Sequence, residues 1–133
     1  MQGVHTVSFW VPGGRTAAYS ARHSVLSAQV GLSSEVRHRL ALLLSELVNN
    51  ATQHGGADAV RGVRVRVAAS ERHVRIEVED PGSEADDPAL RVTAEGGWGL
   101  LLVDRLADAW GREAAGDGGT VVWFELAREA QAA

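Results

Sequence analysis

The sequence predicts an α/β fold of the two-layer type, in which helices cover one face of a mixed, mostly antiparallel sheet. Three observations predict this class. In the first part of the chain, apolar residues recur at helical spacing. From about residue 61, apolar and polar residues alternate as in a strand. Another segment with helical spacing then precedes a last apolar strand. With 133 residues the chain has the size of one ordinary domain, so we expect residues 1–133 to form a single unit.

The composition narrows the class of protein further. Hydrophobic residues make up 45% of the chain and charged residues 23%, with a net charge of -4, which is typical of a globular protein. This balance disfavours direct nucleic-acid binding, which usually requires a basic excess. The chain has no cysteine, which excludes disulfides and thiolate metal sites. It has neither a signal-peptide pattern nor a run of about 20 apolar residues, so we expect a cytoplasmic protein without membrane contact.

The first part of the chain predicts one strand and two helices. Residues 4–11 alternate in polarity and end at a Pro-Gly-Gly turn, so they are the first predicted strand. Residues 15–31 then read as a helix that ends near a glycine. A second helix is predicted from an N-cap at Ser33, with Glu35 in its first turn, to the glycines at 55 and 56. Its apolar residues recur every three or four positions: Val36, Leu40, Leu43, Leu44, Leu47, Val48 and Ala51.

Alternation replaces helical spacing in the middle of the chain. Residues 61–70 and 72–80 place valine or isoleucine between arginine or glutamate, which predicts an antiparallel hairpin with one solvent-exposed face. Residues 81–97 are acidic and interrupted by glycine and proline, as in a mobile surface loop. Residues 98–111 are predicted to form a third helix, and residues 120–127 a final buried strand.

Three polar residues at one-turn spacing, Glu46, Asn50 and His54, lie near the end of the second predicted helix. At about 100° per residue they follow one edge of its apolar face, whereas Asn49 points toward solvent. A carboxylate and a carboxamide one turn apart can polarise a hydroxyl group and give an oxygen ligand to a hard cation such as Mg²⁺. The same residues also fit an ordinary polar helix end.

Two further stretches contain glycines in informative places. Asp80 closes a strand and Gly82 follows it, which indicates either a simple turn or a place where the backbone approaches a flat ligand. Gly96, Gly97 and Gly99 lead into the third predicted helix, where unpaired backbone N–H groups bind an anion or the glycines form a hinge. Neither stretch is a Walker loop or a dinucleotide fingerprint.

In this order along the chain, the motifs resemble those of the GHKL ATPase and kinase superfamily, which has the Bergerat ATP-binding fold. The N, G1, G2 and final boxes of that superfamily correspond to Glu46-x-x-x-Asn50-Ala51-x-x-His54, Asp80-x-Gly82, Gly97-x-Gly99-Leu100 and Gly119-Thr120. The resemblance covers nearly the whole chain. It is closest to small stand-alone ATP-binding proteins related to anti-sigma-factor serine/threonine kinases, through "SELVNNATQHG", "GLLLVDRLADAWG", "GGTVVWFEL" and "SAR".

The resemblance implies a site for ATP and Mg²⁺ made by seven residues: Asn50, Asp80, Gly82, Gly97, Gly99, Leu100 and Thr120. It assigns Asn50 to a Mg²⁺ ion that bridges the phosphates, and Asp80 to the adenine amino group. Thr120 would help to hold the adenine side, and Gly82 would leave room for the ring.

The resemblance assigns phosphate binding to the G2 motif, Gly97-x-Gly99-Leu100, and phosphoryl transfer to Glu46. Gly97 and Gly99 would let the amides at the helix start meet the phosphates, and Leu100 belongs to the same motif. Glu46 would be the general base that orients a hydroxyl nucleophile for in-line transfer of the γ-phosphoryl group. The implied function is an anti-sigma-factor-type serine/threonine protein kinase, which phosphorylates a serine on an anti-sigma-factor antagonist or sequesters a sigma factor.

The implied partners are therefore proteins. The antagonist and the sigma factor are the expected ones, and Arg22 lies in the region of the first helix that is near the partner-binding surface in this family. Relatives often dimerise, so a second copy of the chain is a further candidate partner.

Two alternative interpretations remain beside the kinase. The family often has a basic residue in or just before the G2 glycines, whereas this chain has Glu95 and Trp98 there, and Arg91 is the only cation from 81 to 97. These residues favour a non-catalytic ATP-binding module that regulates a protein partner. A histidine-kinase catalytic domain is disfavoured, because a first helix of roughly 15 residues is too short for the dimerisation module of those enzymes.

Overall fold

The computed structural model of the chain describes residues 4–29, 31–54, 61–82, 97–116 and 118–128. Most of the predicted surface loop at 81–97, and the glycines predicted to end the second helix, lie outside these residues. Within the described residues, no helix is long and apolar enough to cross a membrane.

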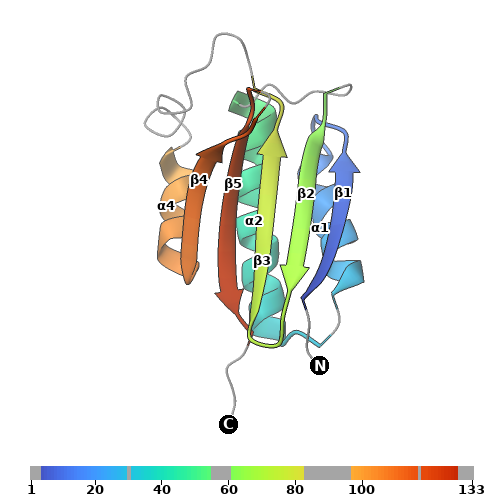
Figure 1. Cartoon of the computed structure of the whole chain (residues 1–133), viewed down its shortest axis with the longest axis vertical. Helices are drawn as coiled ribbons and strands as arrows, with labels where there is room; N and C mark the ends of the chain where they lie inside the picture. Colours follow the sequence, from blue (N-terminus) through green and yellow to red (C-terminus); the bar gives the residue numbers. More distant parts are fainter. Residues whose placement is uncertain (1–3, 30, 55–60, 83–96, 117, 129–133) are drawn as a thin grey trace.

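A five-stranded sheet in the order β1-β2-β3-β5-β4 forms one layer of the structure. Its strands are β1 (His5–Val11), β2 (Val63–Ala69), β3 (His73–Asp80), β4 (Ala109–Ala114) and β5 (Thr120–Ala127), and each neighbouring pair is antiparallel. The helices α1 (Ala17–Ala28), α2 (Ser34–His54) and α4 (Gly97–Leu106) lie on one face of this sheet (Figure 1). The predicted two-layer fold, with a mostly antiparallel sheet, is confirmed.

The α2 helix lies behind the middle of the sheet and contributes most to the helical side of the core (Figure 1). All seven apolar residues predicted on its inner face are buried, and Leu40, Leu43 and Leu44 have no exposed surface. They belong to the same core as Ile76 of β3 and Phe124 of β5. Because burial of one such side chain contributes about 1.5–3 kcal/mol, this helix anchors the whole layer.

Side-chain hydrogen bonds define the start of α2 and join it to α1. The Ser33 hydroxyl oxygen accepts a hydrogen bond from the Val36 N–H at 3.2 Å, which confirms the predicted N-cap. The Arg37 guanidinium donates to the Gln29 carbonyl oxygen at 2.8 Å. The α1 helix is shorter than the predicted range of 15–31, because Gln29 is extended, with φ -108° and ψ 115°.

The segment after Gly97 differs from the prediction of one helix over residues 98–111. The α4 helix ends at Leu106, and the chain then forms β4, which the sequence did not predict. Trp110 follows Leu106 at helical spacing, and the two alanines and the glycine of this strand have low strand propensity. Pairing with β5 overrides that propensity: Asp108 N–H donates to the Glu125 carbonyl oxygen, and Trp110 lies opposite Phe124.

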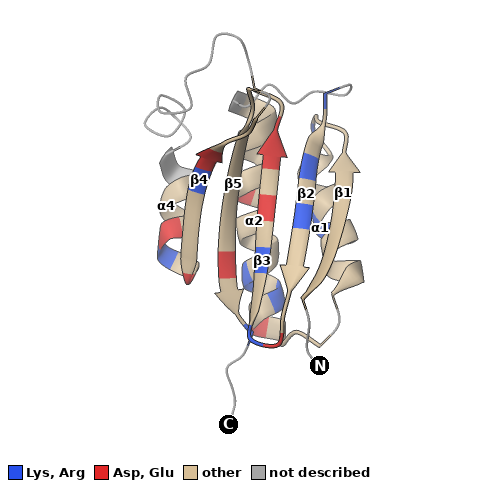
Figure 2. Ribbon diagram, viewed as in Figure 1, with Lys and Arg blue, Asp and Glu red and all other residues tan. Residues whose placement is uncertain are grey.

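The two faces of the sheet have different side chains. In β2, Val63, Val65 and Val67 face the helices and are fully buried, whereas Arg64 and Arg66 are exposed on the opposite side. We call this helix-free side the open face. Figure 2 shows that arginines of β2 lie beside glutamates of β3 in the sheet. The predicted hairpin with one solvent-exposed face is therefore confirmed.

Candidate functional site

The site residues predicted on α2, β3 and β5 lie toward one end of the molecule, at the top of Figure 1. The second half of α2 and the carboxyl end of β3 reach this end, where β5 and α4 begin. The α2 helix contacts β3, β5 and α4 directly. The fold thus brings together four motifs that are far apart in the sequence.

Asp80 and Thr120 form a pair of buried polar residues at this end of the sheet. Asp80 is the last residue of β3 and lies opposite Thr120, the first residue of β5. Their exposed fractions are only 6% and 1%. One carboxylate oxygen of Asp80, Oδ1, accepts a hydrogen bond from the Gly82 N–H at 2.9 Å. Burial of a carboxylate is costly without such bonds, so this position has a specific polar environment.

Glycines allow the segments next to Asp80 and Thr120 to pack backbone against backbone. Gly82 has a φ of +82°, and a Cβ at this position would overlap the carbonyl oxygen of Gly118. A Cβ at Gly119 would likewise overlap the carbonyl oxygen of Asp80. Gly82 therefore has a packing role in addition to the ligand role implied by the resemblance.

Arg61 is a neighbour of this site that the sequence interpretation did not identify. Its guanidinium Nη2 donates a hydrogen bond to the Gly82 carbonyl oxygen at 2.7 Å. Gly82 is thus fixed by two side chains. Arg61 binds the Gly82 carbonyl oxygen, and Asp80 binds the Gly82 N–H. No local pattern around Arg61 indicates this contact, because its partner is 21 positions away.

On α2, Glu46 and Asn50 are half-buried, and Asn49 between them is exposed. This confirms the predicted positions of Glu46 and Asn50 at the edge of the apolar face and of Asn49 toward solvent, whereas the side chain of His54 lies outside the described part of the chain. Leu47 and Ala51, which follow them on the inner side, are buried in the core. A carboxylate and a carboxamide therefore lie at the boundary between the core and solvent, one helical turn apart. His54 is the last residue of the helix.

The residues of this end fit Mg²⁺ that arrives with a phosphate ligand. Within the described parts of the chain, no group of three or more His, Cys, Asp or Glu side chains gathers around a single point. Mg²⁺ prefers about six oxygen ligands and keeps several waters, with few protein ligands and substrate phosphates completing the shell. Asn50 has a carboxamide oxygen at this boundary, and Glu46 has a carboxylate one turn before it, so an ion held there would take most of its ligands from phosphate and water oxygens.

The α4 helix begins at Gly97, so Gly97 and Gly99 both belong to its first turn. The first four N–H groups of a helix have no partner within the helix, which makes a helix start suitable for an anion. Leu100 is 6% exposed and Val103 is fully buried, so both pack in the core. This packing fixes the position of the helix start.

Arg22 lies on a separate surface formed by α1 and α2. Its guanidinium Nη1 donates to the Ser45 hydroxyl oxygen at 2.8 Å and lies 5.9 Å from the centre of the Tyr19 ring. It lines a hollow of about 310 Å³ whose other residues are Tyr19, His23, Leu26, Ser27 and Arg37. None of the residues that line this hollow is a predicted nucleotide-site residue.

Comparison with known proteins identifies the family. A family model for the histidine kinase-like ATPase domain matches residues 15–126. The chain belongs to this family. The histidine kinase-like ATPase domain thus includes every predicted site residue, from Arg22 to Thr120. A search of curated proteins finds no significant match.

Two solved structures have the same fold as this histidine kinase-like ATPase domain. One contains the RsbU and RsbW domains of Rv1364c from Mycobacterium tuberculosis, with 24% identity and a TM-score of 0.71 over 96% of this chain. The present chain spans only 34% of that longer one. The other is the SiaB-SiaC complex from Pseudomonas aeruginosa, with 14% identity and a TM-score of 0.56. That match covers 91% of this chain and 89% of the other.

Proposed function

We propose that this protein binds Mg-ATP at the Asp80 end of the sheet and transfers the γ-phosphoryl group to a serine or threonine of a protein partner. The observation that carries the proposal is the buried pair of Asp80 and Thr120, across the end of two core strands in a histidine kinase-like ATPase domain. A carboxylate at such a position recognises a group that donates hydrogen bonds, and the adenine amino group is such a donor.

Each part of the site has a role in holding the nucleotide. Asp80 accepts a hydrogen bond from the adenine amino group, and Thr120 borders the adenine. Asn50 would hold Mg²⁺ through its carboxamide oxygen, and the ion would supply charge neutralisation at the phosphates. Gly97 and Gly99 leave the first amides of α4 accessible to phosphate oxygens. These roles rest on the positions of the residues and on family membership.

Glu46 is the proposed general base. It is half-buried one turn before Asn50, so it would accept the proton of a hydroxyl group that approaches the terminal phosphate. The serine oxygen forms a bond to the γ-phosphorus while the bond to the β-phosphate oxygen breaks. The hydroxyl proton passes to Glu46, and ADP leaves.

The proposed partner is an anti-sigma-factor antagonist or a sigma factor. Support comes from the two structural neighbours, one with RsbU and RsbW domains and one a complex of SiaB with SiaC. The surface around Arg22 is the proposed docking site, because it combines an exposed tyrosine with arginine and histidine side chains around a hollow. Such a surface suits an acidic segment with an apolar residue.

A non-catalytic ATP-binding regulatory module is the second candidate. Glu95 and Trp98 replace the basic residue that the family often places near the G2 glycines, and this favours it. The two candidates share nucleotide binding and differ only in phosphoryl transfer.

Calorimetry and a transfer assay test the two candidates in sequence. Titration with Mg-ATP should give saturable binding, and its absence would refute both. Incubation with γ-labelled ATP and candidate antagonist proteins should then label a serine or threonine. Glu46→Gln should abolish the label and keep ATP binding. Glu35→Gln is the matched control, because it makes the same change in an exposed part of the same helix. Binding without any label would select the regulatory module.

A further inference from the structure

The start of β2 and the end of β3 lie next to each other at the end of the sheet that carries Asp80 (Figure 1). Backbone pairing of the two strands extends to Arg64 and Glu79. The same register, continued beyond this pair, places Arg61 opposite Gly82, and neither of these two residues belongs to a strand. Because Gly82 is buried, its backbone N–H and carbonyl groups still need hydrogen-bond partners.

Two side chains supply these partners. Oδ1 of Asp80 accepts a hydrogen bond from the Gly82 N–H at 2.9 Å, and Nη2 of Arg61 donates to the Gly82 carbonyl oxygen at 2.7 Å. The second bond is short and its donor is charged, which places it among the stronger hydrogen bonds of proteins. Both polar backbone groups of Gly82 are therefore held by side chains.

Gly82 depends on both bonds because a glycine has more backbone freedom than any other residue. Its φ of +82° is one of several conformations that a residue without a Cβ adopts at low cost. The bond to the N–H holds one side of this residue, and the bond to the carbonyl oxygen holds the other. Loss of the Arg61 bond would release the carbonyl, and Gly82 could then leave the conformation in which its N–H points at Asp80.

The direction of the Gly82 N–H matters because this group fixes one oxygen of the Asp80 carboxylate. A side chain that selects one ligand group has to be held in one orientation by supporting contacts. Here the supporting contacts form a chain, from Arg61 to Gly82 and from Gly82 to Asp80. Arg61 is 21 positions from Gly82 in the sequence, so the pairing of β2 with β3 brings the chain together.

We propose that Arg61 is a positioning residue that gives the nucleotide site its preference for adenine. It acts through Gly82, by holding this glycine in the conformation whose N–H orients the Asp80 carboxylate. The inference rests on the proposed function, because the contact between Asp80 and the adenine amino group is part of that function. It adds a residue that lies outside the four sequence motifs.

Calorimetry with two nucleotides tests the proposal. Mg-ATP is compared with the Mg²⁺ complex of purine riboside triphosphate, which has no amino group on the base. The wild-type chain should bind ATP at least about ten-fold more tightly, because a site that accepts a hydrogen bond from an N–H group rejects an analogue without it. Arg61→Met, which has no donor, should bind ATP about five- to ten-fold more weakly and the analogue about as tightly as the wild type.

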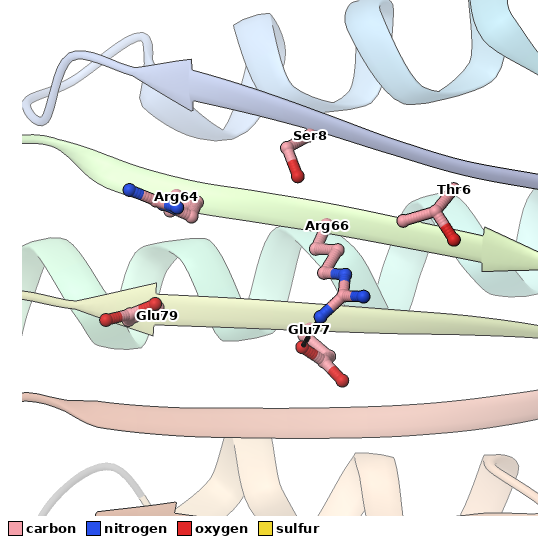
Figure 3. A pocket seen from close by; sticks show the side chains of 6 residues that line it. All are labelled: Thr6, Ser8, Arg64, Arg66, Glu77 and Glu79. Carbon is pink, nitrogen blue, oxygen red and sulfur yellow. Dashed lines mark ion pairs between the residues drawn. The ribbon is translucent and has the colours of Figure 1, made fainter. Parts of the chain in front are cut away.

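Two further variants separate the hydrogen bond from other effects of the substitution. Arg61→Lys should restore most of the preference for ATP, because an ammonium group can donate to a single carbonyl oxygen. Arg64→Met is the matched control, because it makes the same change on the open face, where Arg64 lines a hollow of about 310 Å³ (Figure 3). Arg64→Met should bind both nucleotides like the wild type.

A double-mutant cycle distinguishes positioning from a merely structural role. In the Asp80→Asn background, Arg61→Met should cause no further loss of preference for ATP, because Arg61 acts only through the Asp80 carboxylate. A structural role would instead weaken the binding of both nucleotides, and it would do so in both backgrounds.

Amide hydrogen exchange in the nucleotide-free protein tests the first step of the chain. In Arg61→Met, the Gly82 amide should exchange at least about ten-fold faster than in the wild type, because its local opening becomes easier. Amides in the middle of β3 should be unaffected. Unchanged exchange at Gly82 would show that Arg61 does not hold this residue.

The outcomes separate failure of this proposal from failure of the proposed function. A wild-type chain that binds neither nucleotide would overturn the proposed function and the role of Arg61 with it. A wild-type chain that prefers ATP, together with an Arg61→Met variant that keeps this preference, would overturn the role of Arg61 alone. An effect of Arg61→Met on preference that persists in the Asp80→Asn background would also overturn it.

Discussion

Asp80 occupies a position where the alternation of β3 would otherwise place another apolar residue. Val74, Ile76 and Val78 precede it on the same side of the strand, and all are at most 3% exposed. A carboxylate in this row costs stability, which is expected at a functional site and not in a core selected only for packing. Its hydrogen bond to the Gly82 N–H fixes one carboxylate oxygen. The residue therefore combines burial with a defined orientation.

Asp80→Asn tests the proposed contact between the Asp80 carboxylate and the adenine amino group. We expect the affinity for Mg-ATP to fall at least about ten-fold, equivalent to about 1.4 kcal/mol, because a charged acceptor is lost from the adenine contact. Calorimetry measures the change. Asp104→Asn on the exposed side of α4 should leave the affinity unchanged. An unaltered dissociation constant in Asp80→Asn would contradict the assignment.

Gly82→Ala tests the backbone packing beside Asp80. A side chain there has an unfavourable positive φ and overlaps the Gly118 carbonyl, so we expect the free energy of unfolding to fall by about 2–4 kcal/mol. Gly14 has a similar positive φ of +117° but no atom within 4 Å of an added Cβ. Gly14→Ala should therefore cost only about 1 kcal/mol. Urea denaturation compares the two, and equal losses would show that the overlap is unimportant.

Among the elements, α2 was predictable from the sequence because its capping, spacing and length agree. Seven apolar positions and an N-cap all indicate the same helix. The β4 strand was not predictable, because most of its residues have weak strand propensity and its conformation depends on pairing with β5. In the candidate site, too, local motifs could be predicted and contacts between distant residues could not. Motif residues such as Asn50 and Asp80 could be named, whereas Arg61 is recognised only through a distant backbone contact.

Ser33→Ala tests the N-cap of α2. Loss of the hydrogen bond from the Val36 N–H should lower the free energy of unfolding by about 1 kcal/mol. Ser34→Ala is the control, because Ser34 is the first residue within the helix and is also exposed. Thermal or urea denaturation measures both variants. A loss as large in Ser34→Ala would mean that the cap hydrogen bond is not the cause.

For the whole molecule, one core supports both the fold and the proposed nucleotide site. The α2 helix contacts α1, α4 and three strands, so the residues it carries are fixed relative to both halves of the sheet. A ligand that contacts α2, α4, β3 and β5 at once would oppose separation of the helices from the sheet. Ligand binding should therefore raise the free energy of unfolding of the whole domain.

Mg-ATP should raise the free energy of unfolding by about 2.7 kcal/mol at one hundred times its dissociation constant. For a domain of this size, the melting temperature should rise by roughly 10 °C. EDTA should remove most of this gain when ATP is present, because the phosphates lose their cation. EDTA alone should change nothing, since the described residues contain no cluster of metal-binding side chains. A melting temperature unaffected by Mg-ATP would contradict the site.

The side chains of β3 alternate between the two faces of the sheet, so one strand contributes to two different surfaces. Its even-numbered residues face the helices and end in Asp80, and its odd-numbered residues, including Glu77 and Glu79, face the opposite side. Point substitutions in one set should therefore combine additively with those in the other. A deletion of one residue within β3 would exchange the two sets, moving valines to solvent and glutamates into the core. A deletion in β3 should therefore be far more harmful than a substitution of one of its exposed residues.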